Sequence, residues 1–166
     1  FKKRIFRKKI EKLIEKKELE QKPAIESSTL HITGVDFESK TVKFRNEYAK
    51  LQIWILSNQS RFQPLCHMYV ASSQAAIIIY DITNLESLNK ISEWCQLIRE
   101  LNGNIPIILI GNKLDLKELR EVSIEQGISV KEKLQLSDFL ELSIKNGENI
   151  EAMFERLTHH ISTNYR

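Results

Sequence analysis

The chain has 166 residues, which is the size of one compact domain. A hydrophobic fraction of 42% and a charged fraction of 28% exclude collagen-like, low-complexity and disorder-dominated proteins. Cys66 and Cys95 are too few for a disulfide scaffold, and no apolar run is long enough to cross a bilayer. We therefore expect a soluble cytoplasmic domain, with peripheral attachment to a membrane left open.

The net charge of +3 is unevenly distributed along the chain. Residues 1–22 contain ten Lys or Arg and four Glu, so the remaining 144 residues carry a net charge of −3. Apolar residues recur at helical spacing in this segment, which predicts a basic amphipathic helix over residues 1–22 and a main domain over residues 23–166. A solvated helix with glutamate–lysine pairs is the plainer interpretation, and binding to an anionic membrane or to nucleic acid is the alternative.

A pair of strands is predicted after the first helix. Val35, Phe37, Val42 and Phe44 lead to a turn near residues 45–47. The return strand alternates between Leu51, Ile53 and Ile55 on one side and Gln52 and Trp54 on the other. This alternation predicts a hairpin with two unlike faces.

The remainder of the chain alternates between apolar strands and helices. Residues 75–81 and 105–111 are continuous apolar runs, which are typical of parallel strands covered on both faces. Helical patterns are expected at 85–101, 123–134 and 149–161, with a further strand at 138–142. This order predicts an α/β fold with a mostly parallel sheet between two helical layers and one antiparallel strand.

Polar loops follow two of these strands at the edge where ligands of open α/β sheets bind. One loop is Asn112-Lys113-Leu114-Asp115, and the other is Ser143-Ile144-Lys145. A fixed aspartate can accept hydrogen bonds from the N1–H and the exocyclic amine of guanine, whereas adenine presents the opposite pattern. Lysine stems can lie along the faces of the base, and a backbone N–H near Ile144 can donate to the guanine carbonyl. The two loops together predict a guanine site.

About four fifths of the chain resembles the small GTPases of the Ras superfamily, and most of all their Rab branch. The resemblance lies in five segments: Thr33-Gly34-Val35-Asp36-Phe37, Leu51-Gln52-Ile53-Trp54, Tyr80-Asp81-Ile82-Thr83-Asn84, Gly111-Asn112-Lys113-Leu114-Asp115 and Ser143-Ile144-Lys145-Asn146-Gly147-Glu148-Asn149-Ile150.

The resemblance implies a three-layer GTPase fold of the phosphate-loop type, with GTP or GDP as ligand and Mg²⁺ as cofactor. It implies that Asp115 reads the guanine and that Ser143 supports Asp115. It further implies that Asn112 joins the two loops, and that Lys113 and Lys145 pack on the base. Ile144 stands where the family usually has alanine, and the family makes its contact with the base there through the backbone.

The segment around residues 55–62 departs from the family pattern. Ile55 replaces the aspartate that holds Mg²⁺ through a water, and Asn58 replaces the glycine that faces the γ-phosphate. Gln59 occupies the position of the glutamine that orients the attacking water, and it could equally be a solvated loop residue. Strict alignment places the metal-contacting threonine one residue before Thr33, which leaves Thr33 as the candidate ligand.

No Gly-x-x-x-x-Gly-Lys-Ser/Thr motif occurs in the 166 residues, although this loop cradles the phosphates in the family. The family places a central strand before it, between the strands at 51–56 and 75–81. Residues 1–6 resemble the segment that follows the loop. We therefore expect the chain to be a fragment that begins just after its phosphate loop.

The leading hypothesis is a Rab-like guanine-nucleotide switch with slow or impaired hydrolysis. The alternative is an inactive pseudo-GTPase that serves as an interaction module. Either one would present residues 34–62 to effectors or regulators and is expected to be monomeric. Nucleic-acid binding is not expected, and residues 163–166 offer no cysteine for a lipid anchor.

Overall fold

The computed structural model describes residues 35–44, 47–56 and 63–164, so the predicted helix over residues 1–22 lies outside the described part. The described elements, in chain order, are β1 (Val35–Phe44), β2 (Glu47–Leu56), α2 (Gln63–Ala71), β3 (Ala76–Asp81), α3 (Leu85–Asn89), α4 (Ile91–Asn102), β4 (Ile107–Asn112), the 3₁₀ helix η2 (Leu114–Leu119), α5 (Ile124–Lys133), β5 (Asp138–Glu141) and α6 (Ile150–Asn164).

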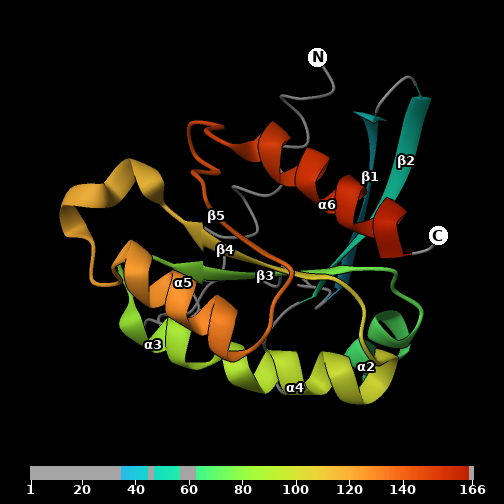
Figure 1. The fold of residues 1–166 in the computed structure, drawn as a ribbon, viewed down its shortest axis with the longest axis horizontal. Helices are drawn as coiled ribbons and strands as arrows, with labels where there is room; N and C mark the ends of the chain where they lie inside the picture. The colour runs from blue at the N-terminus through green and yellow to red at the C-terminus, as the bar shows by residue number, and fades with distance from the viewer. Residues whose placement is uncertain (1–34, 45–46, 57–62, 165–166) are drawn as a thin grey trace, which may run out of the picture.

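A parallel sheet in the order β3-β4-β5 forms the centre of the molecule. Ile78 lies opposite Leu109, and Ile110 lies opposite Leu140. Helices α3, α4 and α5 cover one face of this sheet, and α6 lies on the other (Figure 1). The arrangement confirms the predicted α/β fold, because strands linked by crossover helices must bury both of their faces.

The predicted helical stripe packs into the core on the α4 side of the sheet. Leu88, Ile91, Cys95 and Ile98 are all buried there, together with Tyr80 and other residues of β3 and β4. All six residues of β4 are buried, as expected for a strand with a neighbour on each side. Burial also raises the pKa of the Cys95 thiol, as expected for a cysteine inside an apolar core.

The β1–β2 hairpin packs on the opposite core, next to α6 (Figure 1). Leu51 and Ile53 contact this core while Gln52 and Trp54 remain exposed, so the predicted alternation is confirmed. The Nζ of Lys40 lies 3.0 Å from Glu151 Oε1 and 4.8 Å from the ring centroid of Phe154 in α6. The hairpin is thus attached to the body through side chains.

The facing edges of β2 and β3 are not joined within the described residues. There, β2 pairs only with β1, and β3 pairs only with β4. Ile79 in the middle of β3 is 46% exposed, which is unusual for an apolar residue inside a sheet. The expectation of a central strand between the two edges stays a prediction.

Three local features differ from the expectations. The helix expected over 85–101 is divided at Lys90, whose N–H bonds to the carbonyl of Leu88. Strand β4 begins at Ile107 rather than at 105, because Pro106 has no N–H to offer the sheet. Helix α2 was not predicted from the sequence, although Pro64 in its first turn is a start signal. No described helix is both long and apolar enough to cross a membrane.

Candidate functional site

Two loops meet where β4 and β5 end, as the sequence predicted. Asn112 is the last residue of β4 and is buried. Its side-chain Oδ1 accepts a hydrogen bond from the backbone N–H of Ile144 at 3.1 Å. The N–H of Leu114 in turn donates to the carbonyl of Leu142 at 3.1 Å. These two bonds hold the loops together.

The carboxylate of Asp115 is held by the second loop. The hydroxyl of Ser143 donates to Asp115 Oδ1 at 2.6 Å, and the same oxygen of Ser143 accepts from the N–H of Asn146 at 3.2 Å. Ser143 is fully buried, whereas the Asp115 side chain is 15% exposed. A buried donor on a partly exposed carboxylate fixes its orientation and leaves lone pairs for a ligand.

The two lysines of the site have different surroundings. Lys113 adopts a left-handed backbone with φ of 71°, and its Nζ lies 2.8 Å from Asp81 Oδ2 at the end of β3. Lys145 is 77% exposed at its side chain, and its Nζ is 3.7 Å from Asp115 Oδ2. The described structure therefore brings all six predicted base-binding residues to one edge of the sheet, and Asp81 joins them.

The backbone amide of Ile144 already has a partner in Asn112 Oδ1. The sequence suggested that an amide near this position donates to a guanine carbonyl. If this loop donates a hydrogen bond to the guanine carbonyl, the donor must be a neighbouring backbone amide. Otherwise the amide of Ile144 must first leave Asn112 Oδ1.

A glycine is required directly before Asn112. A Cβ at Gly111 would lie 2.9 Å from the hydroxyl oxygen of Tyr80 and 3.1 Å from Glu141 Cγ. A larger residue would therefore force the side chains of Tyr80 and Glu141 to shift. Gly111 thus allows the close approach that sets Asn112 beside the second loop.

Comparison with known proteins identifies the family of this fold and site. The profile of the Ras family matches residues 22–163. The chain belongs to the Ras family. It is 38% identical over 138 residues to the Ras-related protein Rab-4 of Dictyostelium discoideum, which covers 82% of this chain and 67% of that protein. It is 36% identical over 132 residues to the Ras-related protein Rab-3 of Caenorhabditis elegans, covering 79% of this chain and 60% of that protein.

The side of this Ras-family domain expected to hold the metal differs from the family pattern. Ile55 lies inside β2, opposite Asp36, and provides no oxygen to a cation. Among the described residues no group of three His, Cys, Asp or Glu side chains could hold a metal ion. Thr33, Asn58 and Gln59 lie outside the described residues. Ile55 itself therefore cannot take the role of the family's aspartate.

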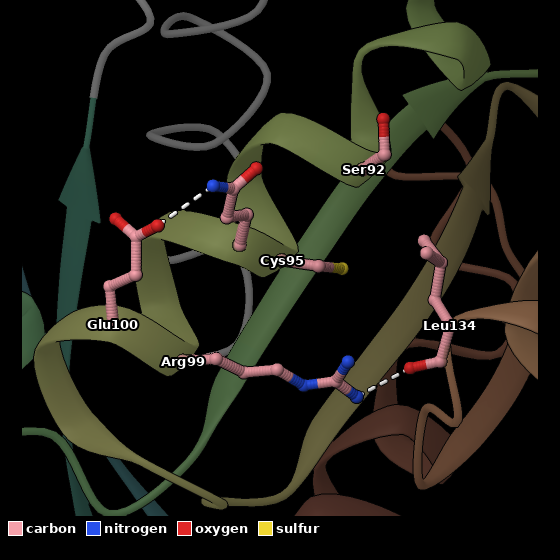
Figure 2. Close-up of a pocket in the computed structure, with 6 residues that line it drawn as sticks. Ser92, Cys95, Arg99, Glu100 and Leu134 are labelled. Atoms are coloured by element: carbon pink, nitrogen blue, oxygen red, sulfur yellow. Dashed lines mark hydrogen bonds between the residues drawn. The ribbon is translucent and has the colours of Figure 1, made fainter.

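A shallow hollow of about 500 Å³ lies between α4 and the end of α5 (Figure 2). Its polar groups already bond to one another: Arg99 donates to the carbonyl of Leu134, and Gln96 donates to Glu100. Cys95, which also lines the hollow, is buried. Because these groups are paired and the predicted loops are elsewhere, this hollow is not the candidate site.

An aromatic cluster lies on the hairpin side of the domain. The ring centroids of Phe37 and Trp54 are 4.7 Å apart, and those of Trp54 and Tyr69 are 4.4 Å apart. Phe37 and Trp54 are each 42% exposed. Aromatic rings of this kind are common in protein interfaces, because they bury a large area at a small entropic cost.

The sequence analysis did not identify Asp81 as a member of the site. The signal was available, since Asp81 ends an apolar strand and a charge at such a position needs a partner. Its partner Lys113 is 32 residues away in the chain, so only the parallel pairing of β3 with β4 shows which lysine it meets.

Proposed function

We propose that this chain is the guanine-binding part of a Rab-like nucleotide switch that binds GDP and GTP. The observation that carries the proposal is the Asp115 carboxylate, which Ser143 holds at 2.6 Å at the carboxyl end of the parallel sheet. In support, the Ras-family profile covers both loops, and the two Rab proteins are similar over most of the chain.

Selectivity for guanine follows from the chemistry of this carboxylate. Guanine presents two donors, N1–H and the exocyclic amine, which a carboxylate accepts together. Adenine presents an acceptor at N1, so its binding would place a lone pair against Asp115 and leave the partly buried charge without a partner. Asn112, Lys113, Ile144 and Lys145 would complete the surroundings of the base.

We further propose that hydrolysis is slow. Ile55 offers Mg²⁺ no oxygen, and a metal that is weakly held stabilises the developing phosphate charge less. Gln59 remains the candidate for orienting the attacking water, and Thr33 the candidate metal ligand. Ile55 also favours the second candidate function, a pseudo-GTPase that uses this fold only to bind other proteins.

For either function, we propose that effectors or regulators bind the region 34–62. The aromatic cluster supports this assignment, because the adjacent rings of Phe37 and Trp54 lie in this region and are exposed, and the ring of Tyr69 packs against Trp54. The domain itself would act as a monomer.

The decisive experiment is the replacement Asp115→Ala in the full-length protein. The affinities for GDP and ADP are measured by displacement of a fluorescent nucleotide. We expect the preference for GDP over ADP to fall by about a hundredfold or more, because both base hydrogen bonds are lost. The replacement Asp115→Asn should shift the preference toward xanthine nucleotides, whose C2 carbonyl accepts from the amide.

Glu118→Ala is the matched control, since Glu118 is an exposed acid on the same 3₁₀ helix. It removes the same charge without touching Ser143 and should leave the preference unchanged. Undiminished selectivity in Asp115→Ala would refute the site. A full-length protein that binds no nucleotide would refute the switch and favour the interaction module.

A further inference from the structure

A partly buried ion pair lies close in sequence to the two loops proposed to bind the base: the Arg120 side chain is 21% exposed. Arg120 donates from Nη1 to Glu141 Oε1 at 2.6 Å and from Nη2 to Glu141 Oε2 at 2.7 Å. The Glu141 side chain is only 8% exposed. Arg120 Nη1 also donates to the carbonyl of Val122 at 2.9 Å. Such a two-pronged arrangement fixes both side chains in distance and in angle.

Each partner of this pair is close in sequence to one loop of the site. Arg120 follows Asp115 by five residues, directly after the 3₁₀ helix η2. Glu141 is the last residue of β5 and precedes Ser143 by two residues. The ion pair therefore joins the segment after the first loop to the strand before the second.

Glu141 also contacts residues that flank both loops. Its Cγ occupies the space beside Gly111, where a Cβ would come within 3.1 Å, and Gly111 precedes Asn112. Its backbone carbonyl accepts from Asn149 Nδ2 at 2.9 Å, which anchors the far end of the second loop. A shift of Glu141 would therefore move the supports of Asn112 and Ser143 together.

Stability alone is a weak reason for such a pair. Removing two charges from water costs about as much as their attraction returns, so buried ion pairs are often replaced by apolar residues without loss of stability. Their geometry is nevertheless strict, because each charge must stay on its partner. A pair of this kind is suited to holding a neighbouring site in one arrangement.

We propose that the Arg120–Glu141 ion pair positions Asp115 and Ser143 for recognition of guanine, which makes Arg120 and Glu141 positioning residues for base selectivity. This inference rests on the proposed function. Its expected signature is a loss of selectivity for the base that exceeds any loss of overall stability.

The test compares the affinities of the full-length protein for GDP and IDP. IDP lacks the exocyclic amine, so the ratio of the two affinities reports the placement of the Asp115 carboxylate. We expect Glu141→Gln to lower this ratio by about tenfold, because residues in one hydrogen-bonded network are coupled. Arg120→Lys should lower it too, since lysine keeps the charge but loses the planar fork.

Two further variants distinguish a positioning pair from general loosening. The double variant Arg120→Lys with Glu141→Gln should lower the ratio no more than Glu141→Gln does alone, because the two residues act as one unit. Asp138→Asn is the matched control. Asp138 begins the same strand, and its Oδ1 forms an ion pair with Arg156 Nη1 at 3.1 Å. Its replacement should leave the ratio within about twofold.

Thermal unfolding of each variant is measured alongside. A lower ratio in Glu141→Gln with an unchanged ratio in Asp138→Asn supports the inference, provided that the two melting temperatures are similar. An unchanged ratio in both Glu141→Gln and Arg120→Lys would overturn it. If Asp115→Ala also leaves base selectivity unchanged, the proposed guanine site itself fails, so the two failures are distinguishable.

Discussion

The base-reading edge and the end of strand β2 follow opposite patterns. At the base-reading edge, Asn112, Asp115 and Ser143 have both the family residue types and the side-chain hydrogen bonds that join the loops. At the end of β2, Ile55 continues an apolar strand where the Ras family has a metal-holding aspartate. The first region is built around polar contacts, and the second is a regular part of a hairpin.

The two regions lie in different parts of the fold. The two loops follow strands β4 and β5 of the β3-β4-β5 sheet, in which every residue of β4 is buried. Ile55 belongs to the hairpin, which is not paired with that sheet within the described residues. Ile55 and the two loops thus belong to different sheets of the described structure.

The largest effect in the weaker region is expected from Ile55→Asp. A carboxylate there would restore a charged acceptor for metal-bound water, worth about 1.5–3 kcal/mol. We therefore expect the affinity for GTP to rise by about tenfold or more in Mg²⁺ relative to EDTA. Titration of the full-length protein with a fluorescent GTP analogue measures both values.

Ile55→Asn is the control for that experiment, because it causes the same loss of apolar packing without adding a charge. It should show no gain in Mg²⁺. If Ile55→Asp likewise shows none, the assignment of this position to the metal is incorrect, and the end of β2 is not a weakened GTPase loop.

A smaller effect is expected at the base edge from Ser143→Ala. The change removes the 2.6 Å hydrogen bond to Asp115 and leaves the carboxylate free to rotate. The loss of one such bond costs about 1–2 kcal/mol, so the preference for GDP over ADP should fall by about tenfold. Nucleotide displacement measures this preference, and Ser129→Ala on the exposed face of α5 is the control. Equal preferences in the two variants would contradict the supporting role of Ser143.

The smallest effect is expected beneath the base edge, at Tyr80. Its buried hydroxyl has no hydrogen-bond partner in the described structure, so Tyr80→Phe should raise the free energy of unfolding by about 1 kcal/mol. Chemical denaturation at neutral pH measures this gain. A clear loss of stability would mean that the hydroxyl has a partner.

The same residue predicts a pH dependence of stability. Burial and the nearby Glu141 carboxylate raise the pKa of Tyr80 above its usual value. The unfolded chain releases the Tyr80 proton near pH 10, while the folded chain retains it. The free energy of unfolding is therefore unaffected by this group below about pH 10 and falls as the pH rises above that value. Tyr80→Phe should therefore lose less stability than the natural protein between about pH 9 and 11. Identical slopes in the two proteins would contradict this account.

Much of the fold and site followed from local patterns. The apolar runs predicted strands β3 and β4, and the alternation of Leu51 and Ile53 with Gln52 and Trp54 predicted the faces of β2. The polar residues after β4 and β5 predicted a site at that edge, and the structure brings them together there. Helix α2 has a weak apolar pattern and was missed.

The sequence by itself determined which segments are strands and helices, because burial on one or both faces imposes a period on the side chains. It also determined the residue types that suit guanine. Only the tertiary structure decided which charges meet: Lys113 with Asp81, and Arg120 with Glu141. These partners are separated by 32 and 21 residues, and no local pattern records them. They meet because parallel strands bring their carboxyl ends to one edge, and there a buried charge must find its partner.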